Sequence, residues 1–402
     1  MSSWIALLAR RPHLRRLWLS AIVSLIGDWL SFVTVAVLSL EASEGPLVLV
    51  GTLAVHQLPA ALLGAFAGTI ADRVDRRALL VAANLAQMAL TLAAVLAAGH
   101  SVLALQGLVL VRSGVAAFLI PAETAALRRV VDPDELGDAN ALIATTWSFA
   151  FVIGMASGGA LATLGAGWAL GLDALTFLFA AAMAFGLPAM VPEREIPATY
   201  SLVGELREAL SLARQEPRLR PLLLAKLPPA LAWGAAWLAL HLVAEARTPF
   251  GPAAVSIGIL QAARGAGTGV GPIVASRWQK TGTSEARLLS AALAILLVAV
   301  AVFVCAERAP VLLVAAFVWG SGSGASWVLS STALSRLAGD ARIGRLSSLD
   351  ELVNVLSMQL SAFVTALLVM AGFSPLAAAA PLLVGAALVG GFNLRALSRA
   401  AG

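Results

Sequence analysis

Residues 64–77 decide the fold of this chain; they read Gly64-Ala-Phe-Ala-Gly68-Thr-Ile-Ala-Asp72-Arg73-Val-Asp75-Arg76-Arg77. The charged end of this stretch is a short turn between two apolar runs, 46–71 and 77–98. A helix needs about 20 mostly apolar residues to cross a bilayer, and both runs are long enough. Lipid offers backbone amides no hydrogen-bond partners, so uninterrupted apolar runs of this length predict transmembrane helices.

The same alternation of apolar run and short polar turn fills the chain. Hydrophobic residues make up 60% of the 402 residues and charged residues 12%, which is too little polar surface for a soluble globule. We therefore predict an all-α integral membrane protein with twelve transmembrane helices. The expected spans are 14–41, 46–71, 77–98, 101–128, 137–164, 167–190, 219–246, 252–277, 286–305, 309–336, 345–371 and 375–397.

Arg and Lys collect in alternate turns, which predicts the side of the membrane that faces the cytoplasm. The opposite turns hold only Arg247 and Arg308. Both termini are therefore expected in the cytoplasm, with the chain in a bacterial inner membrane. The basic residues lie beside apolar helices, where anionic lipid headgroups explain them, so no nucleic-acid partner is expected.

The polar stretch after the sixth span divides the chain. We predict an N-terminal six-helix bundle over 1–190, a cytoplasmic linker over 191–217 and a C-terminal six-helix bundle over 218–402. Leucine spacing within the linker predicts an amphipathic helix that lies along the membrane surface.

The two halves repeat each other. An offset of 207 residues aligns Gly64 with Gly271 and Arg129 with Arg336. Two halves related in this way are typical of transporters.

Three motifs resemble those of the major facilitator superfamily. Residues 64–77 are similar to its G-x-x-x-D-R-x-G-R-R signature, with Asp75 at the usual glycine position. Leu108-Val-Leu-Val-Arg112-Ser-Gly114 resembles the family's buried-arginine motif. Gly154-Met155-Ala-Ser-Gly158-Gly159 resembles its G-P-x-x-G-G antiporter motif, with Met155 in place of proline.

Other segments are most similar to the branch that contains enterobactin exporters and macrolide-efflux proteins. They are Gly27-Asp28-Trp29, Ile120-Pro121-Ala122 and Asp138-Ala-Asn140-Ala-Leu142. The resemblance implies a secondary transporter that works by alternating access.

The resemblance also implies a conformational gate at the turn over 64–77. Its glycines would pack two helix ends closely, Asp72 would face the start of the eleventh span near residues 347–350, and Arg73 or Arg76 would pair with Glu123. Alternatively, the turn only sets the topology. The candidate gate residues are Gly64, Gly68, Asp72, Arg73, Arg76, Arg77 and Glu123.

Two charges lie deep in the first half, Asp28 in the first span and Arg112 in the fourth. A charge at the centre of a span costs about 2.5 to 3.5 kcal/mol, so each needs a partner or a wet cavity. We expect Arg112 to hold Asp28 partly ionised and Asp28 to exchange protons. A fixed ion pair that only aligns helices is the alternative.

Arg264 is the clearest charge within a span of the second half, where it would contact either the substrate or a structural partner. Several Trp residues lie inside spans rather than at their ends, which favours a bulky amphipathic ligand. The candidate binding residues are Trp29, His56, Gln57, Trp147, Trp233, Trp237 and Arg264.

We predict a secondary active transporter, a monomer among membrane lipids, that exports a hydrophobic or amphipathic small molecule, drug-like or siderophore-like, in exchange for protons. A lipid or lysophospholipid translocator and a non-transporting membrane sensor remain open. The sequence has no P-loop, no H-E-x-x-H and no convincing Ser/His/Asp set, so we expect neither ATP hydrolysis nor enzymatic activity. With Cys305 as the single cysteine, no metal and no cofactor are expected.

Overall fold

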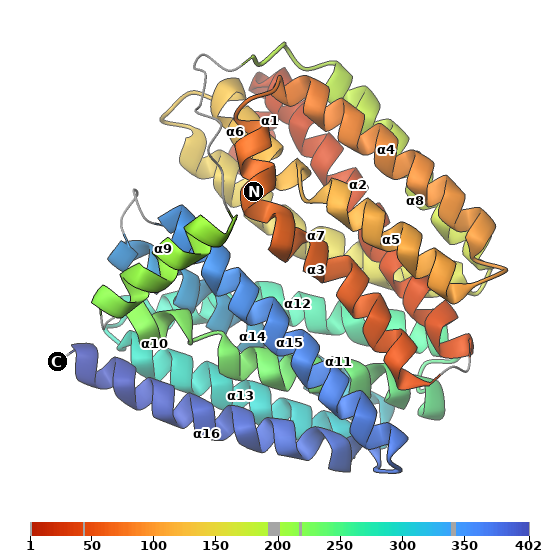
Figure 1. The fold of residues 1–402 in the computed structure, drawn as a ribbon, viewed down its shortest axis with the longest axis vertical. Helices are drawn as coiled ribbons and strands as arrows, with labels where there is room; N and C mark the ends of the chain where they lie inside the picture. The colour runs from red at the N-terminus through yellow and green to blue at the C-terminus, as the bar shows by residue number, and fades with distance from the viewer. Residues whose placement is uncertain (1, 43–44, 192–201, 217–218, 339–342, 402) are drawn as a thin grey trace. The chain divides into compact units, whose positions relative to one another are not determined.

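The computed structural model describes residues 2–42, 45–191, 202–216, 219–338 and 343–401, and within these ranges the regular elements are all helices (Figure 1). This confirms the all-α prediction. The helices are α1 (Ser2–Arg10), α2 (Pro12–Glu41), α3 (Pro46–Ala71), α4 (Arg76–Ala97), α5 (Val102–Ala116), α6 (Leu119–Val130), α7 (Leu136–Ala162), α8 (Ala166–Phe185), α9 (Leu202–Gln215), α10 (Leu219–Leu223), α11 (Leu227–Arg247), α12 (Ala253–Lys280), α13 (Glu285–Cys305), α14 (Ala309–Ala338), α15 (Ile343–Met370) and α16 (Pro375–Ala401).

Among the described residues, 11 segments are long and apolar enough to cross a membrane, so the protein is a multi-pass membrane protein. The twelve spans expected from the sequence include one more, α12. At 28 residues α12 has the length, but Gln261, Arg264 and Arg277 make it more polar than the others. The count of twelve therefore stays a prediction.

Two spans are broken by proline. The span from Val102 to Val130 divides into α5 and α6, and the break lies about one turn before Pro121. A proline has no N–H and its ring clashes with the carbonyl four residues earlier, which here belongs to Ala117. Pro228 and Pro229 interrupt the span from Leu219 to Arg247 in the same way, between α10 and α11.

The chain divides into two compact units, which we describe separately. Unit 1 comprises Met1–Ala42 and Val55–Tyr200, and unit 2 comprises Ser43–Ala54 and Ser201–Gly402. Within the linker predicted over 191–217, residues 192–201 and 217 lie outside the described ranges. The three-part division at 190 and 217 stays a prediction.

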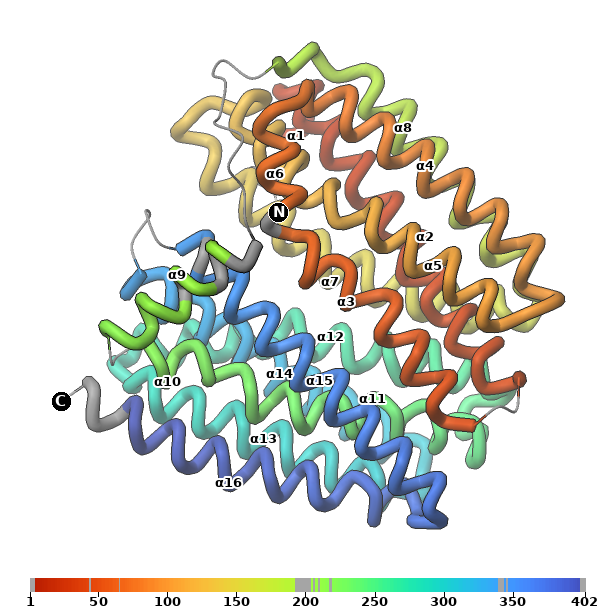
Figure 2. The backbone as a smooth tube through the Cα atoms, viewed as in Figure 1, coloured from red at the N-terminus to blue at the C-terminus, as the bar shows by residue number. Residues whose placement is uncertain are grey.

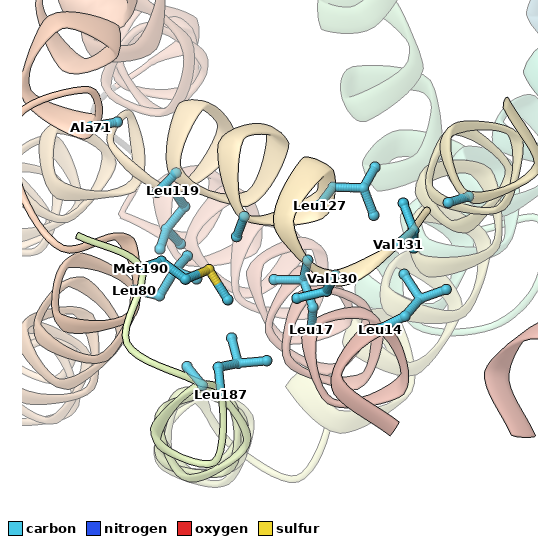
Figure 3. Close-up of a cluster of buried hydrophobic side chains, with 14 of the residues drawn as sticks. Leu14, Leu17, Ala71, Leu80, Leu119, Leu127, Val130, Val131, Leu187 and Met190 are labelled. Atoms are coloured by element: carbon cyan, nitrogen blue, oxygen red, sulfur yellow. The ribbon is translucent and has the colours of Figure 1, made fainter. Parts of the chain in front are cut away.

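In unit 1, α8 packs against both α2 and α4, α2 also packs against α7, and α4 against α5 (Figure 1). Buried apolar side chains join these helices at the end that carries the turn over 64–77. Figure 3 shows Leu14 and Leu17 of α2, Leu80 of α4, Leu127 of α6 and Met190 in this cluster. The cluster fixes the backbone on both sides of the charged turn.

The helix α1 is held by charge at the same end of unit 1. The Arg11 guanidinium bonds to Asp132 and lies 2.8 Å from Oε2 of Glu135, both in the segment between α6 and α7. The hydrogen bonds that Arg11 donates to these carboxylates, first of all to Asp132, raise the pKa of Arg11 above its usual value. These contacts tie the start of the chain to the start of α7.

In unit 2, α11, α13 and α16 pack side by side, and α14 packs against α12 and α13 (Figure 2). The α12–α14 interface is a seam of glycines. Gly267 and Gly271 of α12 lie against backbone carbonyls of α14, and Gly320 and Gly324 of α14 lie against carbonyls of α12, so closely that a Cβ would overlap those oxygens. Small residues allow this backbone approach.

The helix α9 belongs to unit 2 and packs against α15 and α10. Ala213 is 8% exposed and lies in an apolar cluster with Leu334 of α14 and Leu346 of α15. A helix does occupy Leu202–Gln215, and Leu212 near its C-terminal end also packs against this cluster. That the helix is amphipathic and lies along the membrane surface stays a prediction.

Candidate functional site

Unit 1 brings two carboxylates to one guanidinium. Nη2 of Arg112 lies 3.4 Å from Oδ1 of Asp28, so the two residues that the sequence singled out are in contact. Nη1 of Arg112 lies 2.6 Å from Oδ2 of Asp173 on α8. The side chains of Arg112 and Asp173 are 5% and 0% exposed, whereas that of Asp28 is 28% exposed. Asp173 is therefore the buried partner and Asp28 the accessible one.

Asp173 has room beside α2 because the residue that faces it there is a glycine, Gly27. A Cβ at Gly27 would overlap the side chains of Asp173 and Thr176, so α2 and α8 approach this closely only with glycine there. The hydroxyl of Thr176 donates to Oδ1 of Asp173 at 3.4 Å, and Ser31 also hydrogen-bonds to this carboxylate. Sequence reasoning missed Asp173, although it is the single charge within Ala166–Phe185.

Aromatic rings gather on α2, which carries Asp28, and on α7. Trp29 lies edge-on to Trp147 and Phe151, with centroids 5.6 and 4.7 Å away, and Trp147 stacks on Phe151 at 5.3 Å. Phe32 lies edge-on to His56 at 4.6 Å. Trp29 and Trp147 therefore do come together, and Phe32 and Phe151 join them. Trp29, Trp147 and Phe151 thus form an aromatic wall on α2 and α7 in the same unit as the charged cluster.

Two side chains that the sequence singled out in unit 1 each have one polar atom buried without a hydrogen-bond partner among the described residues. These atoms are Nε1 of Trp29 on α2 and Oε1 of Gln57 on α3. His56 precedes Gln57 on α3, and its Nε2 lies 3.5 Å from Nη2 of Arg112. Buried polar groups normally have partners, so each of these atoms is left to pair with a ligand or water.

The charged turn over 64–77 is fastened within unit 1. Asp75 caps the N-terminus of α4, where its Oδ1 accepts a hydrogen bond from the backbone N–H of Arg77 at 2.9 Å. The same oxygen accepts the backbone N–H of Met190 at 3.1 Å. Arg76 donates to the carbonyl of Met190 at 3.1 Å and lies 3.9 Å from Asp72. This explains why aspartate replaces the usual glycine: it joins the turn to the chain beyond α8.

The other gate residues lie as follows. The Arg77 guanidinium lies over the ring of Phe185, 4.7 Å from its centroid. A Cβ on Gly64 or Gly68 would meet no atom within 4 Å, so the described residues show no close packing at either glycine. Glu123 on α6 is close enough to Asp28 for the two carboxylates to interact electrostatically. The expected contact of Asp72 with residues 347–350 involves the other unit and stays a prediction.

The antiporter-like motif packs α7 against the part of α2 that carries Asp28. A Cβ on Gly154 would lie 2.6 Å from the carbonyl oxygen of Ile26, and one on Gly158 would lie 2.7 Å from that of Leu30. Gly159 is also buried. The motif thus sets the position of α2 relative to α7 in this unit.

Unit 2 holds a second buried cation among aromatic rings. The Arg264 guanidinium lies 5.3 Å from the ring centroid of Trp233 and 5.4 Å from that of Trp319. Its Nε donates to Oε1 of Gln261 at 2.8 Å. Nε2 of Gln261 and Nε1 of Trp319 are buried without a hydrogen-bond partner among the described residues. Arg264 therefore has a structural partner and also adjoins unused donors.

Trp233 and Trp237 share a face of α11, as their spacing predicts, and stack with centroids 6.4 Å apart. Trp237 is fully buried and lies 4.1 Å from the ring of His241. Nδ1 of His241 lies 2.8 Å from the carbonyl oxygen of Trp237, which places the ring proton on Nδ1. Of the two tryptophans, only Trp233 keeps part of its surface accessible.

Comparison with solved structures shows the fold. A bacterial homolog of the human lysosomal transporter Spinster shares 16% identity over 97% of this chain and 96% of its own, with a TM-score of 0.68. A peptide transporter, POT, shares 14% over 96% and 94%, with a TM-score of 0.74. The nucleoside transporter NupG shares 12% over 96% and 99%, with a TM-score of 0.73.

Sequence relatives give the family. Uncharacterized MFS-type transporters of Mycobacterium tuberculosis and Mycobacterium bovis are each 32% identical to this chain over 160 residues. That match covers 37% of this chain and about a third, 34%, of each relative. The profile of the family described as transmembrane secretion effectors matches residues 2–398, nearly the whole chain. The chain therefore belongs to the transmembrane secretion effector family of the major facilitator superfamily, whose members are membrane transporters and not enzymes.

Proposed function

We propose that this protein is a secondary active transporter that exports a hydrophobic or amphipathic small molecule, drug-like or siderophore-like, in exchange for protons. It would act by alternating access in a bacterial inner membrane, with both termini in the cytoplasm. The observation that carries the proposal is the sharing of Arg112 by Asp28 and Asp173.

The charge balance of this site favours proton binding. One guanidinium neutralises one carboxylate, whereas Asp28 and Asp173 both contact Arg112 and Glu123 interacts electrostatically with Asp28. Negative charge is therefore left over in an apolar interior, where isolated charge is costly. Asp173 is fully buried and lies closer to Arg112, whereas the Asp28 side chain is 28% exposed, so Asp28 is the carboxylate that we expect to exchange the proton. A proton on Asp28 removes the excess charge and frees Arg112 from one partner. A change in cargo binding then follows from the change in protonation.

The surroundings of the charges support an amphipathic cargo. Trp29, Trp147 and Phe151 form a continuous aromatic wall in unit 1, and Nε1 of Trp29 is an unused donor. In unit 2, Arg264 lies beside Trp233 and close to unused donors. Both sites offer apolar area with a few polar groups, which is the usual composition of a small-molecule site. The resemblance to the macrolide-efflux and enterobactin-exporter branch supports the same cargo class.

Ligand-induced thermal stabilisation of the purified protein, screened at two pH values, tests the proton site. We expect the screen to find a ligand that stabilises the protein. Its affinity should depend on pH in the wild type and should not depend on pH in Asp28→Asn. Glu307→Gln, an exposed carboxylate, is the matched control and should keep the pH dependence. Retention of the pH dependence in Asp28→Asn would overturn Asp28 as the proton site.

Proteoliposomes test direction and coupling. An acidic proteoliposome lumen should drive accumulation of the ligand found in the screen, because a proton leaves the lumen in exchange for the ligand that enters. Accumulation driven by an alkaline lumen would show symport and overturn exchange. Uptake of a lysolipid in place of this ligand would identify a lipid translocator, and binding without counterflow would identify a sensor.

A further inference from the structure

Unit 2 buries two cations in different surroundings. Nζ of Lys226, in the break between α10 and α11, lies 2.6 Å from Oδ2 of Asp350, and both side chains are 5% exposed. That pair is neutral in itself. Arg264 on α12 is also 5% exposed, and its Nε donates to Oε1 of Gln261, an uncharged acceptor. The groups around Arg264 therefore indicate what kind of ligand it can bind.

The bond to Arg264 fixes the orientation of the Gln261 amide. A guanidinium only donates hydrogen bonds, so the amide presents its oxygen to Arg264 and keeps the N–H bonds of Nε2 for other partners. Gln261 is fully buried, and its Nε2 has no hydrogen-bond partner among the described residues. Because Nε2 and Oε1 share one carbon atom, this unused donor lies next to the guanidinium.

A second unused donor comes from α14. Trp319 is fully buried, its ring centroid lies 5.4 Å from Cζ of Arg264, and its Nε1 has no hydrogen-bond partner in the part of the chain that the structure describes. Glycine fixes this arrangement, because a Cβ on Gly320 would lie 3.1 Å from Cα of Arg264 and closer still to its carbonyl oxygen. The indole donor is thus held beside Arg264 before a ligand binds.

These groups all call for an acceptor. The Arg264 guanidinium, the Gln261 amide nitrogen and the Trp319 indole nitrogen all donate hydrogen bonds, and a buried donor without a partner is costly. The positive charge favours an anionic acceptor, because charge-assisted hydrogen bonds are shorter and stronger than neutral ones. The same charge repels a cationic ligand. A carboxylate or phosphate oxygen meets both requirements.

The apolar part of such a ligand has a surface to lie on. The ring of Trp233 on α11 lies 5.3 Å from Cζ of Arg264 and stacks on Trp237, with centroids 6.4 Å apart. Trp233 keeps part of its surface accessible, whereas Gln261 and Trp319 are fully buried. We therefore expect the ligand to approach Arg264 along the Trp233 ring.

We propose that Arg264, Gln261 and Trp319 form an oxyanion site in unit 2. Its ligand is an amphipath that places a carboxylate or phosphate group against Arg264 and its apolar part against Trp233. Gln261 and Trp319 then select the anion over a neutral or cationic analogue. That this anion is the transported cargo rests on the proposed function, whereas the binding of the anion does not.

Matched aromatic probes test the site without knowledge of the cargo. Naphthoate, naphthamide and naphthylmethylammonium share one apolar body and differ in charge, and benzoate and phenyl phosphate extend the series to a smaller ring. Thermal stabilisation of the purified protein in a nonionic detergent at neutral pH compares their affinities. We expect naphthoate to bind roughly tenfold or more tightly than naphthamide or naphthylmethylammonium. Equal affinities of naphthoate and naphthamide would overturn the site.

Two substitutions separate the donors from the fold. Gln261→Glu keeps an oxygen for Nε of Arg264 and replaces the amide nitrogen by a second oxygen, so the guanidinium is neutralised from within. We expect this variant to lose the preference for naphthoate while its melting temperature does not fall. Trp319→Phe keeps a ring beside Arg264 and removes the N–H, so naphthoate should bind several-fold more weakly and naphthamide equally well.

Gln215→Glu is the matched control, because it makes the same change at an exposed position on α9. It should bind naphthoate as the wild type does. Wild-type affinity for naphthoate in Gln261→Glu would overturn the oxyanion site. So would the absence of stabilisation by all three anionic probes and by phosphatidylglycerol. Stabilisation by phosphatidylglycerol alone would support the site and identify a lipid headgroup as the source of the oxyanion.

These outcomes are independent of the proposed proton exchange, because the probes are measured at equilibrium without a pH gradient. Naphthoate binding that is lost in Gln261→Glu, together with no proton-driven flux in proteoliposomes, would support the oxyanion site and overturn the proposed function. Proton-driven flux of naphthylmethylammonium, together with no binding of any anionic probe, would support proton exchange and overturn the oxyanion site.

Discussion

Arg112 lies closer to Asp173, at 2.6 Å, than to Asp28, at 3.4 Å. The Arg112–Asp173 contact is buried inside unit 1, whereas the side chain of Asp28 is partly exposed. One arginine thus has a permanent partner and an exchangeable one, and the two carboxylates should respond differently to mutation.

Asp173→Asn should be the more destabilising of the two neutralising substitutions. Removing one partner of a buried pair costs about 3 to 5 kcal/mol, whereas Asp28 is partly solvated and its loss leaves the Arg112–Asp173 contact in place. Thermal unfolding in detergent should therefore show a larger drop in midpoint for Asp173→Asn than for Asp28→Asn. The reverse order would contradict the assignment of Asp173 as the structural partner.

Gly158→Ala should destabilise unit 1. The new Cβ would lie 2.7 Å from the Leu30 carbonyl oxygen, and overpacking of this kind costs about 1 to 3 kcal/mol. Gly171→Ala on α8 is the control, because its Cβ would meet no atom within 4 Å, and it should be neutral or stabilising by up to about 1 kcal/mol. Equal melting temperatures for the two variants would show that the α2–α7 contact tolerates a methyl group.

Asp75→Ala should lower the melting temperature more than Asp75→Gly. Both variants lose the bond to the Met190 N–H, but loss of an N-cap costs about 0.5 to 2 kcal/mol with alanine and only a few tenths with glycine. Comparison of the two thermal unfolding curves isolates the cap. A glycine variant as unstable as the alanine variant would assign the effect to the Met190 contact alone.

Asp72→Asn should leave the melting temperature unchanged and reduce turnover. Asp72 is 53% exposed, and its contact with Arg76 at 3.9 Å is a surface pair, which contributes about 0 to 1 kcal/mol. The proposed gate nevertheless needs its charge at the start of α15, where the positive end of the helix dipole favours an anion. The measurement is cargo flux in proteoliposomes. A flux in Asp72→Asn equal to that of the wild type would contradict a role of Asp72 in the gate.

Arg264→Gln should destabilise unit 2 even without cargo. The guanidinium lies between Trp233 and Trp319, and a desolvated cation–π contact contributes about 2 kcal/mol. Arg277→Gln, on the exposed end of the same helix, is the matched control. A melting temperature equal to that of the control would leave ligand binding as the role of Arg264.

The sequence predicted the helical fold because apolar length and charge placement are local properties. Asp28 and Arg112 stood out for the same reason, since each is a charge within an apolar span. Their contact with Asp173 depends on how α8 packs against α2, and no spacing along the chain encodes that. Lys226 was also hidden, because its burial follows from a helix break that two prolines impose downstream.

The glycines of the recognised motifs show the same limit of prediction from sequence. Gly154 and Gly158 were recognised as a motif, yet the carbonyls they meet on α2 became known only from the packing. Gly64 and Gly68 belong to an equally recognisable motif, and their expected close contacts are not present in the described residues. A motif therefore predicts the type of residue that a site requires better than it predicts the contact that the residue makes.

The glycine seam between α12 and α14 also limits which helices of unit 2 can shift separately. The Arg264 carbonyl lies directly on Gly320, beside Trp319, so a slide of one helix past the other would drive backbone atoms together. We therefore expect Arg264 and Trp319 to stay together if unit 2 changes conformation. Trp233 belongs to α11, outside that seam, so a shift of α11 would change the distance from Arg264 to Trp233 and leave the seam intact.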